Sequence, residues 1–148
     1  MSKSGSAAVD IKKRLLDAGI GEDQDESNQN ADWIIFVGMQ PATPDNTITL
    51  YDFGLKNNEP CMNRLGVQSE VEYKGVQVKV RCKDYESGYA MMEEIRENLA
   101  NTGNFDSFDG KYEYNLLQKT DIIPIGEDDG NHRQQFTQNF QATRTKLN

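Results

Sequence analysis

Residues 71–99, VEYKGVQVKVRCKDYESGYAMMEEIRENL, are predicted to run from a strand straight into a helix, and the other predicted elements flank this unit. In the first half, Val76, Val78 and Val80 alternate with polar residues, which is the pattern of a strand with one buried face. From residue 83 to residue 100 the apolar spacing changes to about 3.6 residues, which predicts the longest helix of the chain. The apolar stripe of that helix comprises Tyr85, Tyr89, Met92, Ile95 and Leu99.

The flanking sequence predicts further strands on both sides of this unit. Residues 33–37 (WIIFV) are continuously apolar, as in a strand buried on both faces, whereas residues 47–53 (TITLYDF) alternate. Asp109-Gly110 predicts a hairpin, and Pro124 places its short apolar segment at a sheet edge or a bend. The expected strands are residues 33–37, 47–53, 71–82, 105–108, 111–117, 121–125 and 134–145.

The connections between these strands are less regular. Pro41 and Pro44 predict a turn, and residues 54–66 are expected to form a loop. The alternation changes phase at Lys74-Gly75, which indicates either a β-bulge or a tight turn.

A second, shorter helix is expected near the N-terminus. Ile11, Leu15 and Leu16 share one side of it, Asp10 suits its N-terminal end, and Gly19 suits its C-terminal end. Residues 1–7 are expected to be a disordered lead-in, and residues 8–148 a single domain. The predicted fold class is α+β, with a mixed, mainly antiparallel sheet and two helices packed on one face.

Composition limits the classes of function. The chain has 148 residues and a formal net charge of −8, so it repels phosphate backbones at long range, and stable nucleic-acid binding is not expected. Its two cysteines are expected to be free thiols in a reducing compartment. The N-terminus lacks the apolar core of a signal peptide, and no apolar run approaches the roughly 20 residues of a membrane span. We therefore expect no membrane association.

Few residues suggest chemistry. His132 is the only histidine, and it lies in a polar loop with no cysteine at metal-ligand spacing. A Cys–His pair for nucleophilic catalysis has no local support. Residues 128–131 (DDGN) faintly resemble a calcium loop but lack its alternating ligands and closing glutamate. The prediction is that the protein is not an enzyme and that it holds no metal and no cofactor.

Three blocks of sequence are similar to one known family. They are residues 32–53 (DWIIFVGMQPATPDNTITLYDF), 75–99 (GVQVKVRCKDYESGYAMMEEIRENL) and 121–144 (DIIPIGEDDGNHRQQFTQNFQATR). Together with the first helix they span nearly the whole chain. The combination resembles the minor capsid or tail terminator family of tailed phages that infect Gram-positive bacteria.

The resemblance implies a structural role in the virion. A member would cap the head-proximal end of the tail tube as a ring, hexameric by analogy with related terminators, and join it to the head connector. Its partners would be further copies of itself, the tail tube protein and the connector or completion protein, and it would assemble in the host cytoplasm. The family's fold, a mixed sheet flanked by helices, agrees with the strands and helices expected above. The family has no active-site residues, so the resemblance assigns none to this chain.

Two further hypotheses concern the acidic surface and one loop. The alternative function is an acidic inhibitor that mimics DNA and blocks a host nucleic-acid enzyme, which rests on the charge alone. Residues 127–133 join two expected strands, and their mixed charges suit an assembly interface, although a solvated hairpin tip would have the same composition. The candidate interface residues are Glu127, Asp128, Asp129, His132 and Arg133.

Overall fold

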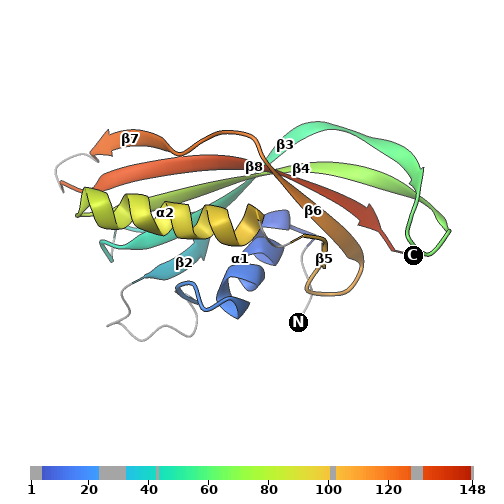
Figure 1. Cartoon of the computed structure of the whole chain (residues 1–148), viewed down its shortest axis with the longest axis horizontal. Helices are drawn as coiled ribbons and strands as arrows, with labels where there is room; N and C mark the ends of the chain where they lie inside the picture. Colours follow the sequence, from blue (N-terminus) through green and yellow to red (C-terminus); the bar gives the residue numbers. More distant parts are fainter. Residues whose placement is uncertain (1–4, 24–32, 43, 101–102, 128–131, 148) are drawn as a thin grey trace.

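The computed structural model describes residues 5–23, 33–42, 44–100, 103–127 and 132–147. Within these ranges the chain forms two helices and one eight-stranded sheet, so the fold class is α+β (Figure 1). The helices are α1 (Ala7–Asp17) and α2 (Tyr85–Ala100). The strands are β1 (Glu22–Asp23), β2 (Ile34–Val37), β3 (Thr47–Met62), β4 (Gln68–Cys82), β5 (Phe105–Asp106), β6 (Tyr112–Gln118), β7 (Ile123–Glu127) and β8 (Gln134–Lys146).

The sheet is mixed, which corrects the prediction of a mainly antiparallel one. Its strand order is β1-β2-β3-β4-β8-β6-β5, and β7 pairs with β8. Strands β1, β2 and β3 are mutually parallel, with Ile34 opposite Thr47, and antiparallel pairing begins at β3. The segment in which Pro41 and Pro44 predict a turn returns the chain to the start of β2, so that β3 runs parallel to β2. A hydrophobic pattern predicts that a segment is a strand, but it does not predict whether two strands pair in parallel or antiparallel.

The expected loop over residues 54–66 is mostly strand. Strand β3 extends to Met62 and forms a long hairpin with β4 around residues 63–67. The phase change at Lys74-Gly75 is neither a turn nor a bulge in β4, because β4 pairs with β8 without a register shift from Val71 to Cys82. The register shifts lie in the pairing of β4 with its other neighbour, β3, at residues 54–59 of β3. A bulge in one strand is invisible in the sequence of its neighbour.

Both helices contact the sheet (Figure 1). Helix α1 contacts β2, β3 and β4, whereas α2 contacts β4, β6 and β8. Local sequence explains where they begin: the Ser6 hydroxyl accepts from the Val9 N–H, and the Asp84 carboxylate accepts from the Ser87 N–H. The buried core between helices and sheet includes Ile11, Leu15, Ile48, Leu50, Val76, Val78, Val80, Met92, Ile95, Leu99, Phe136 and Phe140.

Candidate functional site

The predicted interface loop is described only at its two ends. Asp128 and Asp129 lie outside the described residues, so the structure says nothing of them. Glu127 ends β7, and His132 precedes β8 with a φ of 54°. Both side chains are exposed, and Nδ1 of His132 lies 3.5 Å from Oε1 of Glu127, an ion pair only when the imidazole is protonated. These two residues therefore lie on the surface, where an interface role stays a prediction.

Arg133 points into its own subunit. Its side chain is buried and donates a hydrogen bond of 2.5 Å to the Ala42 carbonyl, with Asp45 at 3.7 Å. Arg81, also buried, donates to the Pro44 carbonyl at 2.6 Å. Two guanidinium groups thus hold the proline-containing segment between β2 and β3 against the sheet. The sequence predicted a turn here but gave no sign that arginines from β4 and the start of β8 would fix it.

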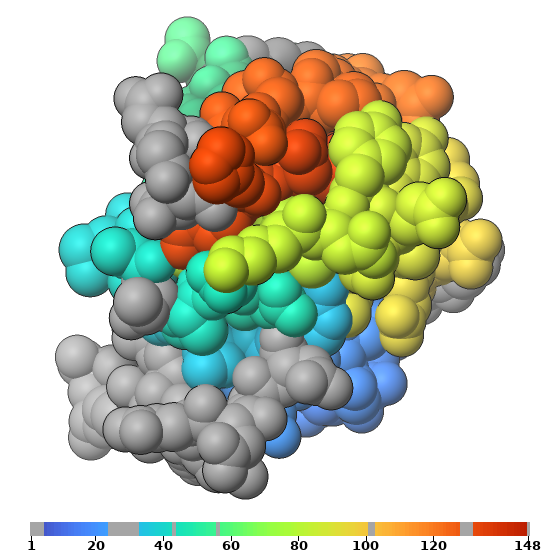
Figure 2. Space-filling view, turned by 90° about the vertical axis from the view of Figure 1, so that its left-hand side faces the viewer, coloured from blue at the N-terminus to red at the C-terminus, as the bar shows by residue number. Residues whose placement is uncertain are grey.

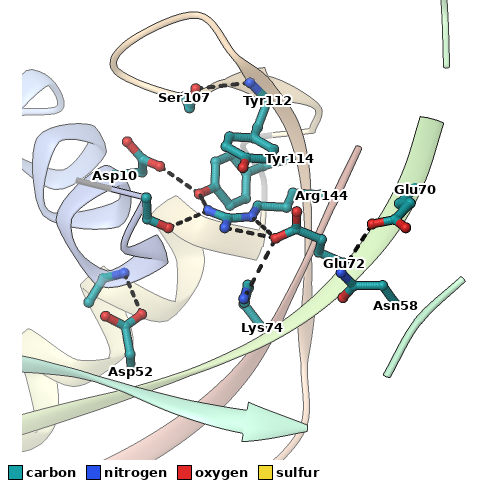
Figure 3. A network of polar contacts seen from close by, with 12 residues as sticks. Asp10, Asp52, Asn58, Glu70, Glu72, Lys74, Ser107, Tyr112, Tyr114 and Arg144 are labelled. Atoms are coloured by element: carbon teal, nitrogen blue, oxygen red, sulfur yellow. Dashed lines mark hydrogen bonds and ion pairs between the residues drawn. The ribbon is translucent and has the colours of Figure 1, made fainter. Parts of the chain in front are cut away.

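A buried polar network joins α1, β4, β6, β8 and the segment before α1 (Figure 3). Tyr114 of β6 donates to Asp10 of α1 at 2.5 Å and accepts from Arg144 of β8 at 2.8 Å. Arg144 also binds Glu72 of β4 through two nitrogens, at 2.9 and 2.8 Å, and donates to the Gly5 carbonyl at 2.6 Å. Sequence reasoning missed this network, because its members are far apart in the chain and only folding brings them together.

Electrostatics explains why the network holds its charges. Burial, then the hydrogen bond to the Asp10 carboxylate, raises the pKa of Tyr114, so the phenol keeps its proton. Burial opposes the charge of Arg144, but the hydrogen bonds with Tyr114 and Glu72 outweigh it and raise the pKa of the guanidinium. The network carries fixed charges and a fixed proton, which suits a structural clamp rather than proton transfer.

The described residues contain no metal-binding cluster of His, Cys, Asp and Glu side chains. Cys61 and Cys82 are free thiols, and burial raises the pKa of the Cys82 thiol. In the described part of the chain, no helix is long and apolar enough to cross a bilayer.

Two groups of exposed apolar side chains lie at the two ends of the long axis (Figure 1), while others, such as Phe53 and Leu55 of β3 and Leu117 of β6, lie elsewhere. At one end, the hairpin of β3 and β4 exposes Met62, Leu65 and Val67. At the other end, the start of α2 exposes Tyr85 beside a shallow hollow of about 460 Å³, and β7 exposes Ile123 and Ile125. Figure 2 looks onto this second end, where the start of α2 lies next to β7 and β8. Isolated exposed apolar residues are ordinary, but groups of them mark interaction surfaces.

Comparison with known proteins gives the family. A model of the bacteriophage tail terminator proteins matches residues 14–146. The chain belongs to the bacteriophage tail terminator protein family. No curated protein matches the chain. Among solved structures, a chain from the "Virion of native gene transfer agent (GTA) particle" is similar at a TM-score of 0.49 and 10% identity, over 96% of each chain.

Membership confirms, at family level, the resemblance carried by the three sequence blocks. A tail terminator is a structural component of the phage tail, and it associates there with other virion proteins. This role agrees with the prediction that the protein is not an enzyme. In a tail terminator, exposed apolar groups are candidate contacts with neighbouring proteins.

Proposed function

We propose that this tail terminator protein closes the head-proximal end of a tail tube as a homo-oligomeric ring, six-fold by analogy with related terminators, and joins the tube to the head connector. The observation that carries the proposal is the family match over residues 14–146. A ring needs heterologous contacts, in which one surface of a subunit meets a different surface of the next and the rotation closes. Separate exposed apolar groups at the two ends of the subunit are consistent with such contacts.

The partners of such a ring follow from its position. One axial surface would meet the tail tube protein and the other the connector or completion protein. The net charge of −8 per subunit would make a ring repel DNA that passes through it, so the ring would not retain DNA. Assembly would take place in the host cytoplasm before the ring becomes part of the virion.

The loop over residues 127–133 belongs to this proposal as an axial or lateral contact. Glu127 and His132 are exposed, while Arg133 holds the loop's end from inside. Rim charge pairs contribute only about 0–1 kcal/mol each, but a ring repeats each contact around its circumference. The double change Asp128→Lys and Asp129→Lys should therefore lower ring yield at low salt, with little change in subunit melting. The double change Asp17→Lys and Glu22→Lys, which alters charge equally on exposed residues elsewhere, is the control.

Electron microscopy and sedimentation of the purified protein, alone and mixed with tail tubes, test the proposal. Rings, or tubes closed at one end, are the expected result. A protein that stays monomeric in both conditions would contradict it. A soluble complex with a DNA-processing enzyme, together with the absence of rings, would favour the acidic inhibitor instead.

A further inference from the structure

The turn between β3 and β4 exposes three large apolar side chains in a short stretch. Met62, Leu65 and Val67 are 72%, 63% and 49% exposed. We define these three residues as the apolar tip. Side chains of this size are normally buried, so a group of them on one turn is a candidate contact surface.

The apolar tip is held in one conformation by hydrogen bonds beneath it. The buried Asn63 side chain accepts from the N–H groups of Leu65 and Val67, at 2.9 and 3.1 Å, and donates to the Lys146 carbonyl at 3.0 Å. The same carbonyl accepts from the Ser69 hydroxyl at 2.8 Å. These hydrogen bonds therefore attach the turn to the end of β8.

An arginine attaches the turn to two further strands, β5 and β6. Arg64 binds Asp106 of β5 through two nitrogens at 3.2 Å and Glu113 of β6 at 2.6 Å. The residues of the turn thus divide their tasks: Asn63 and Arg64 hold the turn in place, and Met62, Leu65 and Val67 expose their apolar side chains. A surface fixed before binding loses little conformational entropy on docking.

The opposite end of the subunit carries a second surface with exposed apolar side chains. The hollow at the start of α2 is lined by Tyr85, Glu86, Tyr89, Ala90 and Glu93. Tyr85 is 47% exposed and leans on the buried Phe136 with a ring-centroid distance of 5.0 Å, so its ring is supported from below. Exposed aromatic rings that are fixed in this way are frequent at the centres of protein interfaces.

The two surfaces cannot meet within one subunit, because they lie at opposite ends of its long axis (Figure 1). We propose that the apolar tip of one subunit docks into the hollow at the start of α2 of the next subunit. This inference rests on the proposed function, since it names the contact by which copies of the chain form the ring. Such a contact is heterologous, and repeated head to tail it produces either a closed ring or a filament.

Charge at the rim of the two surfaces favours this pairing over contact between two hollows. The hollow is flanked by the carboxylates of Glu86 and Glu93. Lys146, whose carbonyl holds the tip, has an exposed side chain beside it. Two hollows would bring carboxylates together, whereas the Lys146 ammonium group near the tip and the carboxylates of the hollow have opposite charges. The Arg64 guanidinium of the tip is balanced by Asp106 and Glu113 of its own subunit.

The first experiment alters each surface separately. Leu65→Asp places a charge on the tip without removing the Asn63 hydrogen bonds, and Ala90→Arg fills the hollow from an exposed helix position. Each should lower ring yield at fixed protein concentration by about tenfold or more, the size expected for a central interface residue. Leu117→Asp, on a leucine 51% exposed in β6, and Ala100→Arg, at the far end of α2, are the matched controls. Thermal melting of all four variants checks that the subunit still folds.

The second experiment identifies which surfaces meet. In a Cys61→Ser background, Leu65→Cys and Ala90→Cys are combined and treated with a short bismaleimide. The double variant should give a ladder of cross-linked species above dimer, and each single variant should stay monomeric on a denaturing gel. Dimers from Leu65→Cys alone would show tip-to-tip contact and overturn the inference.

The outcomes separate this inference from the proposed function. Wild-type protein that forms rings while Leu65→Asp and Ala90→Arg form them equally well would overturn the docking contact and leave the ring intact. Wild-type protein that forms no rings and no capped tubes would overturn the proposed function itself.

Discussion

The Tyr114 hydroxyl donates a hydrogen bond of 2.5 Å to the Asp10 carboxylate across 104 positions of sequence. This contact connects α1 to β6, and Arg144 extends it to β4 and to the N-terminal segment. The Asp10 carboxylate also accepts from the Phe108 N–H at 3.0 Å, which fixes the turn between β5 and β6. One buried carboxylate thus sets the position of a helix relative to the far strands of the sheet.

Tyr114→Phe should lower the free energy of unfolding by about 1–3 kcal/mol, because it leaves a buried carboxylate and a buried guanidinium each short of a partner. The shape of the core is otherwise kept. Denaturant unfolding measures the effect. Tyr112→Phe is the control, since the ring of Tyr112 lies against Arg144 at 4.0 Å and that contact survives the change. A loss below about 0.5 kcal/mol for Tyr114→Phe would mean that water replaces the hydroxyl at little cost.

Gly88→Ala tests the packing of α2 on the sheet. Alanine is the better helix residue by about 0.5–1 kcal/mol. However, its Cβ would lie 2.7 Å from the ring of Phe136, which is fully buried and has little room to move. Overpacking of this kind costs about 1–3 kcal/mol, so we expect a net loss of stability.

The control for Gly88→Ala is Gly54→Ala in β3, where a new Cβ meets nothing within 4 Å. That variant should stay within about 1 kcal/mol of wild type. If Gly88→Ala melts above wild type in the same assay, then the helix moves away from β8 more easily than the contact suggests.

Short-range periodicity predicted the elements that bury a regular face. The stripe over residues 85–99 became α2, whose Met92, Ile95 and Leu99 are buried. The alternation over residues 134–145 became β8, with Phe136 and Phe140 in the core. The Asp-Gly hairpin formed where its turn residues indicated, between β5 and β6. In each case the information lies in neighbouring residues, which is where periodicity and turn chemistry act.

Features that depend on distant partners could not be predicted in this way. Strand β3 continues through residues 54–62 although that stretch lacks alternation, because β4 supplies its hydrogen bonds. Gln138 and Arg144 occupy inward positions of β8, where a polar side chain needs a buried partner, and Thr120 and Glu72 provide these partners. Arg133 was a candidate for a contact with a neighbouring subunit, but its guanidinium binds the Ala42 carbonyl of the same chain.

The two thiols should differ in reactivity. Cys82 is buried, and burial raises the pKa of its thiol, so less of the reactive thiolate forms at pH 8. Cys61 lies partly exposed near the end of β3. In the native protein, Ellman's reagent should modify Cys61 at least about tenfold faster than Cys82. In denaturant it should modify both thiols rapidly. The Cys61→Ser variant should lose the fast phase; a fast phase that persists in it would contradict the buried position of Cys82.

Arg133→Met separates an internal role of this arginine from a role between subunits. Methionine keeps much of the apolar stem but removes the donor to Ala42 and the charge near Asp45. Because the side chain is buried, we expect the isolated subunit to lose about 1–3 kcal/mol of stability in denaturant unfolding. His132→Ala, at the exposed neighbouring position, should change stability by less than about 0.5 kcal/mol. If Arg133→Met instead leaves subunit stability unchanged and reduces only ring formation, the guanidinium acts on a neighbouring subunit, and its contact with Ala42 contributes little.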